Sequence, residues 1–108
     1  MNIFYLDPDP VKCARMHVDK HVVKMIVEYA QLLSTAHRVL DGRESIELSK
    51  NGRKVKRYRF DDNYKEATYY LACHISHPSA VWARQSSLNY RWLSVSYTHL
   101  RAHETTLD

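Results

Sequence analysis

The chain has little of the residues that mark several classes of protein. Its 108 residues include only two glycines, three prolines and two cysteines. So few glycines and prolines exclude collagen-like and low-complexity sequences, and two cysteines do not make the disulfide framework of a small secreted domain. Cys13 and Cys73 lie in apolar, helix-like contexts, so we expect both to be reduced and buried. No apolar run approaches the roughly 18 residues of a membrane span, and the first six residues are too few for a signal peptide.

The last residues stand apart because they resemble a translated DNA adaptor. Residues 95–105 have the sequence VSYTHLRAHET, which is similar to one reading frame of the adaptor used in transposase-based sequencing libraries. The sequence therefore predicts that residues 95–108 are a non-native tail on a truncated gene from a metagenomic assembly, and that the native C-terminus is missing. We assign no function to His99, His103 or Glu104.

Length and charge limit the number of domains in residues 1–94 and the kind of partner that the chain suits. A chain of that size allows one small domain with a modest core. The whole chain is basic, with a formal net charge of +4. That charge suits an anionic partner such as nucleic acid, although solubility alone also explains it. We expect a single helical domain over residues 1–94.

Two helices are expected in the first half of the chain. Asp9 and Pro10 suit the start of a helix that runs to about Met16. Asp19 is a candidate cap for a longer helix from Lys20 to about Leu40, which Asp41-Gly42 would end. An apolar stripe at three- and four-residue steps supports this second helix. Its members are Val22, Met25, Tyr29, Leu32, Leu33 and Ala36, and Val23, Val27 and Ala30 would widen it.

The second half of the chain has a different pattern. Residues 43–60 look like an insertion in which alternating residues and Asn51-Gly52 predict a β-hairpin with a two-residue turn, about 45–50 paired with 53–59. Helical patterns cover 61–74 and then 78–93, the latter starting at Pro78. The predicted fold is therefore mainly α: three to four packed helices, a short extended N-terminal segment and a basic β-hairpin insertion, truncated at the C-terminus.

The first candidate site lies on the long helix. His17, His21, Lys24 and Glu28 recur at steps of four, three and four, so they share one helix face. The functional interpretation is acid–base or imine chemistry, with Glu28 as the carboxylate, His21 beside it, and Lys20 or Lys24 as an amine or phosphate ligand. The alternative is a solvated face in which Lys24 and Glu28 form an ordinary i,i+4 pair.

A second candidate site is the basic run of the hairpin. Residues 50–59 carry six basic side chains and no acid. Such a hairpin can lie along a phosphate backbone; equally, its charges can protect a strand edge from aggregation. We select as nucleic-acid contacts Lys24, Lys54, Lys56, Arg57, Arg59 and Arg84, the last because it follows Trp82 on the opposite side of its helix.

A third, weaker candidate is a metal site. His17 and His21 are separated by three residues, and His74 and His77 by two, spacings that suit zinc or another transition metal. The chain has no CxxC or HExxH motif, and His77 also suits the cap of the helix that starts at Pro78. We therefore keep this set as an alternative and expect no cofactor.

Two resemblances follow from these motifs. The segments DKHVVKM (19–25), HPSAVWAR (77–84) and NYRWL (89–93) resemble small uncharacterised proteins of cyanophages and other marine phages. A remoter resemblance is to the pyrimidine-dimer DNA glycosylases of phages, small basic helical enzymes that use an amine and a glutamate. It implies that Glu28 stabilises an imine, while His21, Lys24 and Arg84 hold phosphates or a flipped-out nucleotide.

These resemblances define the functions to be tested. The first is a phage DNA-processing protein, a pyrimidine-specific glycosylase and abasic-site lyase that works through an imine. The alternatives are a nucleic-acid-binding accessory protein without chemistry and a His-rich metal-dependent domain. The expected partner is DNA, with no membrane, and the expected location is the cytoplasm of an infected host cell.

Overall fold

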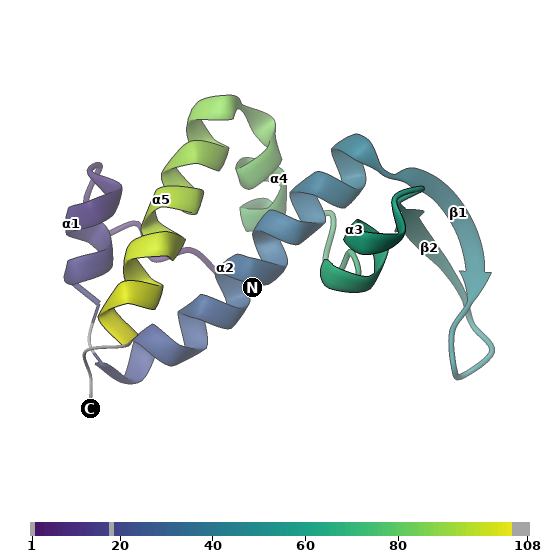
Figure 1. Ribbon diagram of the computed structural model, residues 1–108, viewed down its shortest axis with the longest axis horizontal. Helices are drawn as coiled ribbons and strands as arrows, with labels where there is room; N and C mark the ends of the chain where they lie inside the picture. Colours follow the sequence, from purple (N-terminus) through teal and green to yellow (C-terminus); the bar gives the residue numbers. More distant parts are fainter. Residues whose placement is uncertain (1, 18, 105–108) are drawn as a thin grey trace.

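The computed structural model describes residues 2–17 and 19–104 (Figure 1). The mainly α fold with one hairpin is confirmed, but the described part holds five helices rather than three or four. In chain order the elements are α1 (Pro10–Arg15), α2 (Asp19–Asp41), β1 (Arg43–Leu48), β2 (Lys54–Arg59), α3 (Asn63–Thr68), α4 (Pro78–Gln85) and α5 (Ser87–Glu104).

Four helices, α1, α2, α4 and α5, pack together and form what we call the body (Figure 1). The predicted stripe of α2 is buried, and it meets Cys13 and Ala14 of α1, Ala80 and Ala83 of α4, and Trp92 and Leu93 of α5. Val23 and Val27 do not widen the stripe as expected, because they are 56% and 46% exposed. Cys13 and Cys73 form no disulfide; Cys13 is buried as expected, whereas Cys73 is only half-buried. None of the described helices has the length and apolar composition that a membrane span requires.

Two predicted helices end earlier than expected, and the division of the second of them accounts for the extra helix. The helical pattern of residues 61–74 gives only α3, after which residues 69–77 are irregular and His74 has a positive φ of 49°. The pattern of residues 78–93 is divided at Ser86, whose backbone is extended. The Ser86 hydroxyl accepts a hydrogen bond from the Asn89 amide at 3.1 Å, so it caps a new helix instead of continuing the old one.

The hairpin and α3 form a second unit, the arm, beyond the C-terminal end of α2 (Figure 1). The hairpin is confirmed, but its predicted register is wrong by one residue: Leu48 pairs with Lys54 and Arg43 with Arg59. Beyond the paired strands the Ser49 amide donates to the Arg53 carbonyl at 2.8 Å, so the turn inside this bond has three residues, 50–52. Gly52 takes a positive φ of 76° in this loop, which is the usual position for glycine in a three-residue hairpin loop.

Helix α5 continues into the segment that resembles an adaptor. Residues 95–104 are helical, and Ser96 and Leu100 are buried against the body. Packing of a segment does not establish where its coding sequence comes from, so the non-native origin of residues 95–108 stays a prediction. The sites described below are made by residues of the first 94.

Candidate functional site

The arm is attached to α2 through a buried arginine that the sequence analysis missed. Arg38 is fully buried and donates to both carboxylate oxygens of Glu66, at 2.9 and 3.2 Å. Its guanidinium also donates to the carbonyl oxygens of Tyr58, Tyr69 and Tyr70 at 2.7–3.0 Å, and it lies over the Phe60 ring. These hydrogen bonds hold the pKa of Glu66 at about 2. These acceptors lie in β2, in α3 and in the two residues that follow α3, so Arg38 joins α2 to the arm and has a structural role.

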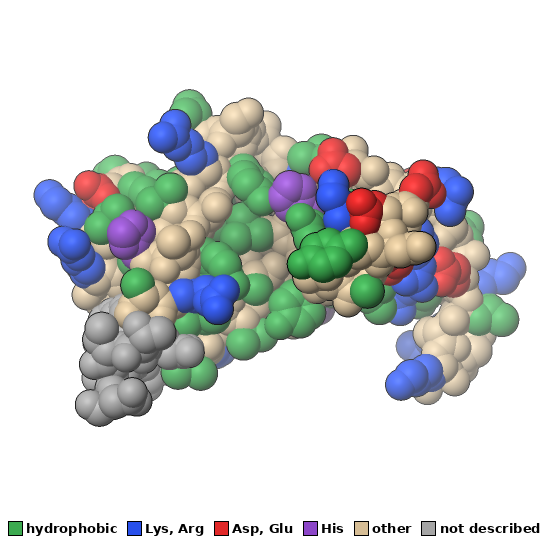
Figure 2. All heavy atoms as spheres, viewed as in Figure 1, with side chains coloured by type: hydrophobic (Ala, Val, Ile, Leu, Met, Phe, Trp, Pro, Cys, Tyr) green, Lys and Arg blue, Asp and Glu red, His purple; other side chains and the backbone are tan. Residues whose placement is uncertain are grey.

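Two of the four predicted nucleic-acid contacts of the hairpin are paired with acids. Arg59 donates to Glu47 at 2.6 and 2.8 Å and to Glu66 at 3.1 Å, and Lys56 lies 3.4 Å from Glu44. The basic run therefore has compensating acids, which come from β1 and α3 rather than from the run itself. Figure 2 shows acidic and basic side chains interspersed over the arm.

The register also divides the predicted contacts between two faces of the hairpin. Lys54 and Lys56 lie opposite Leu48 and Ile46, whereas Arg57 and Arg59 project from the other face. Ile46 and Leu48 are each 71% exposed, so the first face combines two lysines with exposed apolar side chains. Within the described part of the chain, Lys54 and Arg57 form no ion pair.

The first candidate site lies where the start of the chain meets the middle of α2 (Figure 1). The Phe4 amide donates to the Tyr29 hydroxyl at 2.9 Å, and the Phe4 ring contacts the His21 ring with centroids 5.0 Å apart. Glu28, next to Tyr29, is half-buried, and its Oε2 atom is out of contact with solvent. Lys24 is exposed on the same helix. The side chain of Lys20, a predicted catalytic residue, lies outside the described residues.

Burial also affects Tyr29 itself. Its side chain is fully buried, and desolvation raises its pKa to about 12 despite the hydrogen bond from Phe4. The phenol is therefore neutral at physiological pH and accepts the Phe4 amide proton. This bond attaches the N-terminal segment to α2 at the residue that follows Glu28.

The histidines of the metal alternative lie in different environments and are not grouped. His17 is buried and its Nδ1 donates to the Cys13 carbonyl at 2.8 Å, while its ring packs near Phe4. His77 caps α4 as expected, because its Nδ1 accepts from the Ser79 amide at 3.1 Å. His74 is exposed. Among the described residues, no three His, Cys, Asp or Glu side chains come together as metal ligands.

An aromatic hollow adjoins the N-terminal segment. It has a volume of about 490 Å³ and is lined by Ile3, Tyr5, Pro78, Ser79, Trp82 and Asn89. The Tyr5 ring stacks on Trp92 with centroids 4.7 Å apart, and Trp82 meets Trp92 edge to face. Tyr5 is 55% exposed. The hollow thus presents aromatic surface beside two polar side chains.

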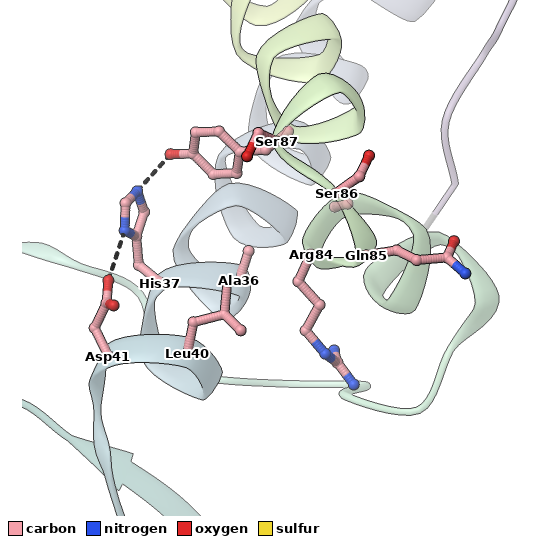
Figure 3. Close-up of a pocket in the computed structure, with 10 residues that line it drawn as sticks. Ala36, His37, Leu40, Asp41, Arg84, Gln85, Ser86 and Ser87 are labelled. Carbon is pink, nitrogen blue, oxygen red and sulfur yellow. Dashed lines mark hydrogen bonds and ion pairs between the residues drawn. The ribbon is translucent and has the colours of Figure 1, made fainter.

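A separate pocket of about 440 Å³ contains Arg84 (Figure 3). It lies between the C-terminal part of α2 and the junction of α4 with α5. His37 connects two other lining residues, since its Nδ1 is 3.3 Å from Asp41 and its Nε2 is hydrogen-bonded to the Tyr90 hydroxyl. Burial, and next the neighbouring Tyr69, raise the pKa of the Tyr90 phenol.

Arg84 differs from the arginines of the arm. Its Nη1 atom is buried and has no hydrogen-bond partner among the described residues. The sequence analysis selected Arg84 but missed His37, Asp41 and Tyr90. The i,i+4 spacing of His37 and Asp41 was a usable signal, whereas nothing in the sequence places Tyr90, 53 residues further on, against His37.

No family model, curated protein or solved structure matches this chain. The resemblances to phage proteins thus rest on the motifs alone, and the function has to be argued from the sites.

Proposed function

We propose that the chain is a phage DNA-processing protein that acts on damaged or modified pyrimidines as a DNA glycosylase and abasic-site lyase, in the cytoplasm of an infected cell. The observation that carries the proposal is the hydrogen bond from Phe4 to Tyr29, which attaches the N-terminal segment to α2 at the residue that follows Glu28. The phage glycosylases that the sequence resembles use an amine and a glutamate that lie close together in the active site.

The proposed chemistry is redox-neutral. An amine of the protein attacks C1′ of an abasic sugar, and the aldehyde oxygen leaves as water to give an imine. The Glu28 carboxylate then takes a proton from C2′, and the C3′–O bond breaks with the phosphate as leaving group. The candidate amines, the amino group of residue 1 and Lys20, lie outside the described residues. His21 and Lys24 would contact the flanking phosphates.

The surroundings of Glu28 suit this role. A general base needs a fixed position and limited access of water. Glu28 is half-buried on a long helix, and the Phe4 and His21 rings pack together on a neighbouring part of the same face. The chain thus offers a half-buried carboxylate on the helix face that also carries the exposed Lys24.

The aromatic hollow gives the proposal a place for the target base. Enzymes that act on a base extrude it from the stack and hold it against aromatic side chains with a few polar contacts. Tyr5 and Trp82 supply the aromatic surface, and Ser79 and Asn89 supply the polar groups. Its volume of about 490 Å³ exceeds what one pyrimidine needs.

The test is borohydride trapping on DNA with an abasic site. We expect a covalent protein–DNA adduct, which mass spectrometry maps to the amino group of residue 1 or to a lysine. Glu28→Gln should slow strand cleavage by about 100-fold or more, whereas Glu44→Gln, an exposed carboxylate of the arm, should leave it unchanged. Equal cleavage by the Glu28→Gln variant removes Glu28 from the mechanism, and absence of an adduct overturns the lyase proposal.

A second candidate function is nucleic-acid binding without chemistry. It is favoured by Lys54 and Lys56, which share one exposed hairpin face with Ile46 and Leu48. Lys54→Gln with Lys56→Gln should weaken binding to a DNA duplex and flatten its salt dependence by up to about two contacts. Glu28→Gln should have no effect on this binding. Unchanged affinity in the double variant would leave the hairpin as a solubilising surface.

A further inference from the structure

The pocket of Arg84 has the features of a site for a small anionic ligand. Three of its lining residues, Ala36, Leu40 and Ala83, are apolar, and Arg84 brings a positive charge to the same space (Figure 3). Arg38 provides a comparison, because each of its three guanidinium nitrogens donates to an acceptor within the protein. Arg84 has a buried Nη1 without one.

Within the described part of the chain Arg84 forms no ion pair, so no neighbouring acid neutralises its charge, and that charge favours an anion in the pocket that Arg84 lines. We propose that this pocket binds a phosphate group carried on a nucleotide-sized molecule. The guanidinium of Arg84 provides the charge and paired N–H donors, which match the oxygens of a phosphate. Because Glu28 is not among the residues of the pocket, the proposal does not depend on imine chemistry.

The other polar lining residues fit the same ligand. Ser86 and Ser87 lie at the start of α5, where the Asn89 amide is bonded to the Ser86 hydroxyl but the Ser87 and Leu88 amides have no acceptor among the described residues and favour an anion. Tyr90 can donate its hydroxyl proton when Nε2 of His37 carries the proton of the bond between them. The one acid of the lining, Asp41, faces His37 rather than standing alone, which limits its repulsion of an anion.

The volume argues for more than inorganic phosphate. At about 440 Å³ the pocket has room for a sugar and a base besides the phosphate. The same chemistry could come from a free mononucleotide or from the phosphorylated end of a nucleic acid strand. The experiment therefore includes both.

The test is isothermal titration with inorganic phosphate, deoxythymidine 5′-monophosphate, and one oligonucleotide with and without a 5′-phosphate. Each phosphorylated ligand is compared with its unphosphorylated form: the monophosphate with thymidine, and the 5′-phosphorylated oligonucleotide with the same strand lacking the phosphate. We expect the phosphorylated form to bind more tightly in at least one of these two pairs. Whichever of the two binds identifies the source of the phosphate. Arg84→Gln should weaken that binding by about 10- to 100-fold, and Tyr90→Phe by a smaller factor.

The matched control is Arg91→Gln, which removes the same charge from an exposed position of α5 outside the pocket. It should leave phosphate binding unchanged. Absence of binding by every phosphate probe, or equal weakening by Arg84→Gln and Arg91→Gln, overturns the proposal. If Arg84→Gln fails to fold, the Tyr90→Phe result decides, because that variant keeps the ring and loses only the hydroxyl. Borohydride trapping reports on Glu28 independently, so failure of either proposal is distinguishable from failure of the other.

Discussion

The body and the arm of this molecule are stabilised by different interactions. In the body, apolar side chains from four helices form one buried cluster, in which Tyr29, Leu32 and Leu93 are fully buried. The arm instead meets α2 through Arg38 and Glu66, with Arg59 and Glu47 extending the charged network. Apolar packing tolerates small shifts, whereas a buried ion pair depends on each partner being present.

This difference explains why the arm is the more fragile unit. A two-stranded hairpin is at best marginally stable by itself. Ile46 and Leu48 on its outer face are exposed, so among the described residues this face has no packing partner. The structure of the arm therefore depends on a few polar contacts at its base. Gly42, at the junction, is required there because a Cβ atom would collide with the Arg38 carbonyl oxygen.

The largest effect is expected from Glu66→Ala. This change removes both carboxylate acceptors from the fully buried Arg38 and leaves its charge uncompensated, which costs about 3–5 kcal/mol. Amide hydrogen exchange should show loss of protection in β1 and β2 while α2 and α5 stay protected. The control is Glu44→Ala, which removes an exposed partner of Lys56 and should cost less than about 1 kcal/mol. Equal loss of protection in body and arm would show that the two are one cooperative unit.

A core substitution tests the body and its C-terminal part together. Leu100 is fully buried, so Leu100→Ala should lower the free energy of unfolding by about 2–5 kcal/mol, measured by urea denaturation. Thr98→Ala, at an exposed position of the same helix, should change it by no more than about 0.5 kcal/mol. If Leu100→Ala has no effect, residues 95–104 are not part of the fold in solution, as their resemblance to an adaptor implies.

The contrast between the two regions also explains what the sequence could predict. The stripe of α2 and the start of α1 at Asp9-Pro10 follow from local periodicity and capping, and both are observed. The burial of Arg38 does not follow from any local pattern, because its acceptors lie 20 to 32 residues away. The hairpin register was missed because Asn51-Gly52 also suits a three-residue loop with Gly52 at positive φ.

The same limit applies to the candidate sites. Periodicity placed His21, Lys24 and Glu28 on one helix, but it did not show that Phe4 and Tyr29 attach the N-terminal segment there. Local sequence also made residues 50–59 look uniformly basic, since the acids that pair with them come from β1 and α3. Contacts between distant segments decide which charged residues remain available to a ligand.

Acid should release the arm before it affects the body. Hydrogen bonds from Arg38 and from Arg59 hold the pKa values of Glu66 and Glu47, respectively, at about 2, below the ordinary value of 4.5. Their stabilisation is complete above pH 4.5 and is lost as the pH falls toward 2. The loss should be smaller than in Glu66→Ala, because a protonated carboxyl keeps its shape and one acceptor. Amide exchange of β1 and β2 between pH 5 and pH 2.5 measures it, and Glu66→Gln should reduce the pH dependence.

High pH should destabilise the body before the arm, the reverse of the order expected at low pH. Burial raises the pKa of Tyr29 from 10.0 to about 12, so the folded state resists ionisation that the unfolded state undergoes freely. The resulting stabilisation is complete below pH 10 and is lost as the pH rises toward 12, with a loss of about 1 kcal/mol at pH 11. Urea denaturation at pH 9 and pH 11 measures the difference. Tyr29→Phe should abolish this pH dependence while lowering stability at pH 9, because the Phe4 amide loses its acceptor. A pH dependence that persists in Tyr29→Phe would assign the alkaline effect to other groups and remove Tyr29 as the source of the contrast with the arm.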